Sequence, residues 1–308
     1  MTAYCLFMAA KFFLLSLLVQ APVVFAQSGV SEKMSLDRPP TPGETAYYRI
    51  VRTDETLDAQ GRVTGRRHSS GLFLRETLYV GADGTRTDRY TWKSFSTGRT
   101  DGSSDSVRMT AVAAVTGFSF DLSSGDRLSV PALAVGGMAK TTETFVFFTV
   151  VWDAVALFRN AAARPGYPIG QLEHIDDRIE ETTVPAPAVF DFTPVVSRFS
   201  YVRGTTTTEL AGFGPVNGVP CVLLRFETRP GPIAYLYRTE RQTIEIRGTE
   251  RSEGSIRMAT DRPVVLQGEM TGLLVAMQTG TLPGKTVETP IVIRQKTRME
   301  RVSAESLD

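Results

Sequence analysis

The sequence predicts a mainly β protein: a large curved antiparallel sheet, or open half-barrel, with one apolar α-helix inserted against its concave face. Runs of alternating apolar and polar residues recur along the chain and are separated by Gly- or Asp-containing turns. One turn, Asn217-Gly218, is a strong hairpin signal, because both central residues of a type I′ turn need positive φ. One long apolar run, 145–158, has helical rather than strand spacing.

Residues 1–26 have the layout of a secretory signal peptide. Lys11 precedes an apolar run over 12–19, and small residues occupy the first and third positions before a cut after Ala26. The run is shorter than the roughly 20 apolar residues that span a bilayer. We therefore expect export to the periplasm or the extracellular space, with no transmembrane segment in the mature chain.

The mature chain is expected to form one domain. Residues 27–43 are polar and contain three prolines, which predicts a flexible leader. Residues 44–302 are expected to form a single antiparallel β domain, and 303–308 a loose tail. Two β halves joined near 164–196 are the alternative topology. Cys221 is the only cysteine after the predicted cut, so no internal disulfide can form, and a buried, inert thiol is expected.

Four strands are expected in the first part of this domain. Alternation begins at Ala46, and polar turns containing glycine separate the runs. The expected strands start at 46, cover 71–80 and 85–95 and resume over 107–122, with turns at 58–61 and 81–84 and a polar loop over 98–106.

The apolar run in the middle of the chain predicts a helix over about 143–162. Two rows of apolar side chains recur at helical spacing, so the helix should be buried over a broad arc. Thr141 or Thr142 can cap its amino end, and Pro165-Gly166 should stop it.

The remainder of the chain returns to strands. Residues 172–181 carry acids at helical spacing, and a Pro-rich connector over 184–194 follows. The expected strands cover 197–202, 211–216, 219–227, 233–247, 254–259, 264–274 and 286–302, with breaks at 251–254 and 261–263.

Signatures of catalysis are absent from the sequence. It contains no Gly-x-Ser-x-Gly, His-Glu-x-x-His, Walker or Cys-x-x-Cys motif, and only two histidines, His68 and His174. The segment 174–177 holds one histidine and two aspartates, but a metal site needs three or four converging ligands, so a solvated acidic turn is favoured. We expect a protein that is not an enzyme, with no catalytic residue, no metal and no cofactor.

The charge balance and the aromatic residues limit the kinds of partner that we expect this chain to bind. The chain carries 34 basic and 33 acidic residues, a balance that argues against binding to nucleic acid. Aromatic pairs at i, i+2 project from one face of a strand. If those faces coincide, they form either a dry core under the helix or the lining of a site for an apolar small molecule or lipid. The candidate lining residues are Phe145, Phe148, Trp152, Phe118, Phe120, Tyr235 and Tyr237.

The segment Gly254–Val265 is a strand, an Asp-led turn and a returning strand. Together with the signal and the inserted helix, it resembles the outer-membrane lipoprotein carrier superfamily and related exported bacterial domains of unknown function. The resemblance covers a short part of the chain and transfers no functional residue. It implies an open half-barrel whose helices cover a hydrophobic cavity.

Two functions follow from these observations. The first is a non-catalytic exported cell-envelope protein that binds or carries an apolar, lipid-like ligand. The alternative is a structural or protein-interaction β domain with a filled core and no ligand. An aromatic-lined cavity of several hundred Å³ would favour the first, and a filled interior the second. The oligomeric state is left open.

Overall fold

The computed structural model describes residues 41–82, 86–102, 107–123, 138–161, 172, 174–181, 188–192, 195–202, 204–238, 243–262, 264–282 and 285–307. These residues belong to one compact unit, Met34–Asp308. The predicted signal peptide and most of the predicted leader lie outside the described residues, as does the Pro-Gly pair at 165–166.

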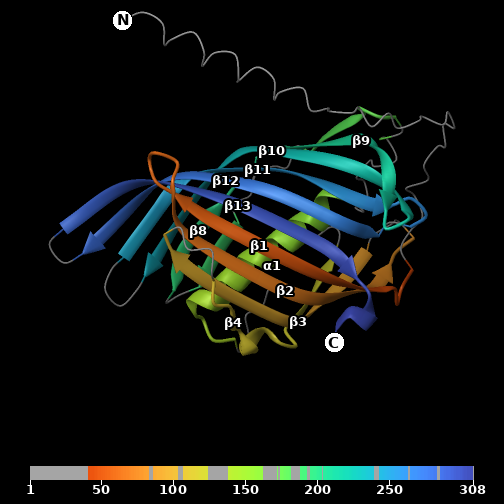
Figure 1. Cartoon of the computed structure of the whole chain (residues 1–308), viewed down its shortest axis with the longest axis horizontal. Coiled ribbons are helices and arrows are strands. Elements are labelled where there is room, and N and C mark those ends of the chain that lie inside the picture. Colours follow the sequence, from red (N-terminus) through yellow and green to blue (C-terminus); the bar gives the residue numbers. More distant parts are fainter. Residues whose placement is uncertain are drawn as a thin grey trace, which may run out of the picture. The chain divides into compact units, whose positions relative to one another are not determined.

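The fold is one large antiparallel sheet, as the sequence predicts. Its strand order is β4-β3-β2-β1-β13-β12-β11-β10-β8-β7, with β5 paired to β3, and β9 paired to β10 and β6 (Figure 1). Among the described strands the sheet is open, with β4 and β7 at its two ends. The strands are β1 Thr45–Leu57, β2 Val63–Val80, β3 Arg86–Asp101, β4 Thr110–Ala111, β5 Ser119–Ser123, β6 Arg178–Glu181, β7 Ala188–Phe192, β8 Val196–Tyr201, β9 Thr206–Val216, β10 Val219–Arg238, β11 Thr243–Ala259, β12 Val265–Leu282 and β13 Lys285–Val302.

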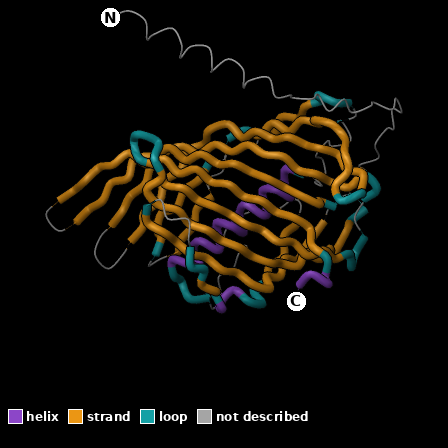
Figure 2. The backbone as a smooth tube through the Cα atoms, in the orientation of Figure 1, coloured by secondary structure: helices purple, strands orange, loops and turns teal. Residues whose placement is uncertain are grey.

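The helix α1, Thr142–Asn160, confirms the helix predicted over about 143–162. Thr141 is its N-cap: the Thr141 hydroxyl accepts from the Thr144 amide, and the Thr144 hydroxyl accepts from the Thr141 amide. This capping box satisfies two amides that would otherwise lack partners. Figures 1 and 2 show α1 crossing behind the sheet. We call the face that α1 covers the helix face, and the opposite one the helix-free face.

The turn at Asn217-Gly218 has the predicted geometry. Its φ angles are 50° and 80°, and the flanking Val216 and Val219 are paired residues of β9 and β10. Asparagine tolerates this left-handed region better than most residues, and glycine meets no steric cost there.

Several expected boundaries in the second half are wrong, because the strands are longer than the apolar runs. The expected strand over 233–247 is two pieces: the end of β10 and the start of β11. Residues 251–254, expected to break the chain, lie inside β11. The charged Arg251 and Glu253 are exposed at alternate positions there, so the strand accommodates them without turning.

The first half shows the same kind of difference. Strand β2 begins at Val63 instead of Gly71, and β3 continues through the expected loop to Asp101. The expected strand over 107–122 is interrupted: short strands β4 and β5 flank a 3-10 turn over Ala113–Val115. Gly117 follows with φ 81°, a conformation that ends regular pairing.

The solvated acidic turn favoured over 174–177 is confirmed: these residues form a largely exposed turn, and strand β6 follows it. Two other segments differ from expectation. The Pro-rich connector contains strand β7, which pairs with β8. The tail expected to be loose forms a 3-10 turn over Ala304–Leu307. In each case, the backbone groups form hydrogen bonds by strand pairing or in a local turn, and composition alone does not reveal this.

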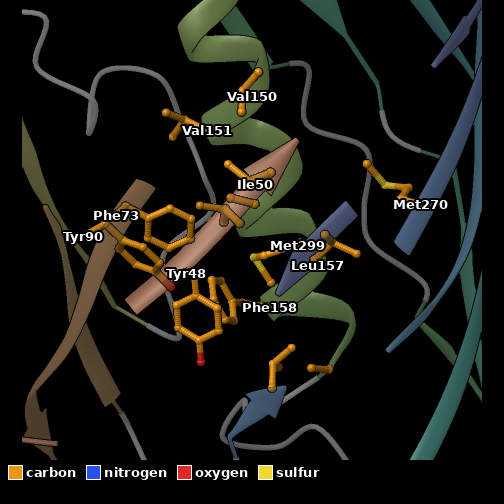
Figure 3. Packing of buried hydrophobic residues seen from close by; sticks show 14 of the residues in the cluster. Tyr48, Ile50, Phe73, Tyr90, Val150, Val151, Leu157, Phe158, Met270 and Met299 are labelled. Atoms are coloured by element: carbon orange, nitrogen blue, oxygen red, sulfur yellow. The ribbon is translucent and has the colours of Figure 1, made fainter. Parts of the chain in front are cut away.

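The core lies between α1 and the sheet and is rich in aromatic side chains. Figure 3 shows Phe158 of the helix beside Tyr48 of β1. The ring centroids of these two residues are 5.0 Å apart, edge to face, and Tyr48 stacks on Phe73 at 5.5 Å. Phe147 lies on the same side of the helix, about three turns nearer its amino end, and contacts Trp92 at 4.8 Å and Phe95 at 5.2 Å. The helix is thus held against the sheet by packed aromatic rings.

Candidate functional site

The first group of predicted lining residues lies deep in the core. Phe118 and Phe120 have ring centroids 6.1 Å apart, although Phe118 precedes β5 and is not part of it. Phe118 also packs edge to face against Phe148 at 5.9 Å. Phe148 and Phe120 are both buried. These three side chains contact one another or the helix.

The other four predicted residues are Phe145 and Trp152 of α1 and Tyr235 and Tyr237 of β10. Trp152 packs edge to face on Tyr201 at 6.0 Å, and the Tyr237 hydroxyl lies 2.9 Å from the Thr142 hydroxyl. Tyr235 lies 6.0 Å from Phe199. These side chains are half-buried. We name this group the aromatic seam: Phe145, Trp152, Phe199, Tyr201, Tyr235 and Tyr237.

A groove of about 980 Å³ lies on the helix-free face, where the sequence predicted no site. Its lining includes the alternate residues of the long strands that point away from α1, such as Arg225 of β10, Ser255 of β11 and Arg298 of β13. In the sequence, these lining residues are the polar ones that alternate with apolar residues along each strand. Because a solvated sheet face produces the same pattern, that signal does not distinguish a groove from ordinary surface.

Two rows of side chains cross the strands along this groove. The first row is Arg178, Glu209, Arg225, Ser255, Glu269, Arg298 and Val51. The second is Thr207, Glu227, Glu253, Thr271, Lys296 and Thr53. The first row crosses seven strands, so six spacings of about 4.8 Å make it about 29 Å long.

Positive and negative side chains alternate along the first row, and the ion pairs between them are exposed to solvent. Arg178 Nε lies 2.9 Å from Glu209 Oε2, and Arg298 Nε lies 3.9 Å from Glu269 Oε1. The side chains of Arg178, Arg298 and Glu269 are more than half exposed. Ion pairs this exposed contribute little to stability, so they can exchange partners at low cost.

Two like charges meet in the second row. Glu227 and Glu253 are directly opposite on β10 and β11. Like charges in this position destabilise a sheet. Within the described part of the chain, neither carboxylate forms an ion pair.

A cluster of charged side chains lies on the helix face, between α1 and the sheet. Arg52 of β1 donates to Asp153 Oδ2 of α1 at 3.1 Å and to Asp54 Oδ1 at 2.8 Å. The Thr297 hydroxyl donates to the same Asp153 oxygen at 2.6 Å. Burial raises the pKa of Asp153, and the Arg52 guanidinium opposes this shift. We call these groups, with Arg67, Glu250 and Gln295, the inner charge cluster.

Glu250 of β11 forms no ion pair among the described residues. With the Gln295 amide oriented to satisfy both its ends, its nitrogen donates to Glu250 Oε1 at 3.1 Å and its oxygen accepts from Arg52 Nη2 at 3.0 Å. Burial, together with the charge of Asp153, raises the pKa of Glu250 to about 7. Burial and the charge of Glu250 raise the pKa of Tyr235 to about 12.

A second buried ionic group is structural in character. Asp88 accepts from Arg75 Nη2 at 2.7 Å, from Arg86 Nε at 2.6 Å and from the Thr77 hydroxyl at 3.0 Å. The Arg75 guanidinium carbon also lies 4.4 Å from the centre of the Phe158 ring. The arrangement fixes the second half of α1 against β2 and β3, through hydrogen bonds and a cation–π contact.

Two residues with reactive side chains, His174 and Cys221, lie at the surface and in the interior, respectively. His174 is exposed, and its Nδ1 lies 3.5 Å from Asp177 Oδ2. Cys221 is buried, as predicted; its thiol donates to the Val219 carbonyl at 3.2 Å, and burial raises its pKa. Across the ranges that the structure describes, no three His, Cys, Asp or Glu residues come together as a metal site.

Within the described ranges, no helix combines the length and the apolar character needed to cross a membrane.

Comparison with known proteins leaves the chain without an assigned family. No family model matches it, and no curated protein matches it. A solved structure of lipovitellin, titled for its lipid–protein interactions, is 10% identical, with a TM-score of 0.40; the match covers 85% of this chain and 25% of that one. Pseudomonas putida OprB is 9% identical, with a TM-score of 0.17; the match covers 84% of this chain and 94% of that one. A porin of Rh. blastica has 7% identity and a TM-score of 0.16, over 84% of this chain and all of its own. This chain thus spans about a quarter of the lipovitellin chain, and likenesses at these TM-scores carry no conclusion about function.

Proposed function

We propose that this chain is a non-catalytic, exported cell-envelope protein that holds an extended, mixed-charge segment of a partner protein in the groove on its helix-free face. The observation that carries the proposal is the groove itself. Its volume of about 980 Å³ lies at the upper end of the range of ligand sites, about 300–1,000 Å³.

The groove is more suited to a polypeptide than to an apolar molecule. Its lining holds five basic side chains, Arg178, Arg225, Arg229, Lys296 and Arg298, and four acidic ones, Glu209, Glu227, Glu253 and Glu269. An extended segment rises about 3.3 Å per residue, so about nine residues match the row of about 29 Å. Charges on such a segment can replace the loose pairs within the first row and relieve the repulsion between Glu227 and Glu253.

The close packing of rings on the helix face supports the same proposal. The ring centroids of Phe118, Phe147 and Phe148 lie within 6 Å of one another. Packing of this kind favours an interaction domain over a carrier.

The test is selection from a library of nine-residue peptides displayed on phage, followed by affinity measurement at low and high salt. We expect selected peptides to alternate in charge and to weaken as salt rises, because exposed charge pairs are screened. The double variant Arg225→Glu/Arg298→Glu should bind them at least about tenfold more weakly, equivalent to about 1.4 kcal/mol. The matched control is Arg89→Glu, an exposed residue of β3 outside the groove that pairs with Asp121. If no peptide is enriched, or if both variants bind equally, the groove is not the binding site.

A second candidate function, the binding of an apolar molecule, is favoured by the aromatic seam. Its six aromatic side chains are half-buried, and two pairs of them are in ring contact, Trp152 with Tyr201 and Phe199 with Tyr235. The purified protein should then release a lipid on extraction with organic solvent, detected by mass spectrometry. Trp152→Ala should lower its amount severalfold, whereas Phe213→Ala, an exposed ring on β9, should not. An extract without lipid would remove this candidate.

A further inference from the structure

The inner charge cluster gathers three carboxylates, Asp54, Asp153 and Glu250, around the guanidinium group of Arg52. Asp54 lies opposite Arg67 in the register of β1 and β2 and also accepts from Arg52. Arg52 binds Asp153 as well. A negative charge on Glu250 repels both Asp54 and Asp153. The repulsion among these carboxylates is therefore relieved when one of them carries a proton.

Glu250 is the carboxylate placed to carry that proton. Asp153 accepts hydrogen bonds from Arg52 and Thr297, which favour its charged form. Glu250 has only the neutral amide of Gln295 as its hydrogen-bond partner among the described residues. Its neighbours on the adjacent strands are Gly231 of β10, which has no side chain, and the apolar Leu274 of β12.

The cluster also connects the sheet to the helix. Asp153 is the side chain through which α1 binds both β1 and β13, by way of Arg52 and Thr297. Arg52 also donates to the Thr149 carbonyl one helical turn earlier. A negative charge on Glu250 repels Asp153 and, through Gln295, competes for the same Arg52.

We propose that protonation of Glu250 is a built-in switch, in which the neutral carboxyl holds α1 against the sheet and its loss of the proton loosens the helix. The charged and titratable groups facing Glu250 are Asp153 from α1, Arg52 and Asp54 from β1, and Tyr235 from β10. The pKa of Tyr235 is about 12, so Tyr235 stays neutral wherever Glu250 titrates.

The direction of the pH dependence follows from the raised pKa of Glu250. Between its ordinary value of 4.5 and about 7, the folded state binds the proton more tightly than the unfolded state. Stability from this group is therefore fully present below pH 4.5 and is lost as the pH rises towards 7 and above. The helix should be most firmly seated in mildly acidic solution.

The experiment is hydrogen exchange of the α1 amides in the full chain between pH 5 and 8.5, expressed as protection relative to the unstructured rate. In the wild type, we expect protection to fall at least about tenfold over this range, with a midpoint near pH 7. Glu250→Gln removes the titration and keeps the shape, so its protection should stay constant. Glu253→Gln is the matched control: it lies three residues along β11, on the helix-free face, and should behave like the wild type.

Two results would overturn the proposal. The first is equal pH dependence in the wild type and in Glu250→Gln, which would place the titration elsewhere. The second is a Glu250→Gln protein that does not fold at pH 8, since the proposal makes the neutral side chain the better fit. Fluorescence of Trp152, which lies on α1 against Tyr201, gives an independent readout of helix seating and should shift with the same midpoint.

Discussion

Replacing Phe147 by alanine should lower the free energy of unfolding by about 3–5 kcal/mol, the cost of removing a large ring from a packed interior. Phe147 is fully buried and contacts the rings of Trp92, Phe95, Phe118 and Phe148. These neighbours come from three separate segments, so the cavity cannot close by the movement of one side chain. Denaturant unfolding monitored by circular dichroism measures the change.

The control for this variant is Phe213→Ala. Phe213 is a ring of the same type on β9 and is 48% exposed. Its removal should change the stability by less than about 1 kcal/mol. A loss for Phe147→Ala as small as that of the control would mean that the space under α1 is loosely packed, and it would strengthen the carrier candidate.

Replacing Arg52 by methionine should lower the free energy of unfolding by about 3–5 kcal/mol at neutral pH, because breaking a buried ion pair leaves charges without a partner. Here Asp54 and Asp153 would lose the cation that both contact, and Glu250 would lose its link to that cation through Gln295. They can recover only by taking up protons, so the deficit should shrink as the pH is lowered towards 4. Thermal melts at several pH values measure both effects.

Arg49→Met serves as the comparison for this substitution. Arg49 lies on the same strand, on the helix-free face, and its Nη1 is 3.7 Å from Glu300 Oε1. Its side chain is 45% exposed, and pairs of this kind contribute about 0–1 kcal/mol. If both variants lost equally little, the inner charge cluster would be hydrated and would not anchor the helix.

The architecture could be predicted from the sequence because its strongest signals are local. The apolar residues of the helical run recur at helical spacing, whereas those of the strands alternate with polar residues. The pair Asn217-Gly218 specifies its own turn geometry. The limits of the strands could not be predicted in the same way. Residues such as Arg251 and Glu253 resemble a break, yet they occupy the solvated side of β11. Whether a polar residue ends a strand or lines its outer face depends on the neighbouring strands.

The candidate sites were less predictable than the fold. The groove combines residues from seven strands, and its two rows exist only because the register brings Glu227 opposite Glu253. Asp153 is a charged residue inside the apolar run of the helix, which the sequence shows directly. Its partner Arg52 is 101 residues away, and no local pattern connects them. Register and long-range pairing are the information that a single sequence lacks.

The pairing of the first and last long strands has a consequence for how the chain acquires its structure. Strand β1 pairs with β13 from Tyr47 with Val302 to Leu57 with Val292, so the centre of the sheet joins segments more than 230 residues apart. Hairpins on either side can form early, but this seam closes only after the last strand has been made. Such distant pairing makes folding slow. Until the two strands pair, β1 presents an unpaired edge, and such an edge favours aggregation of the incompletely folded chain.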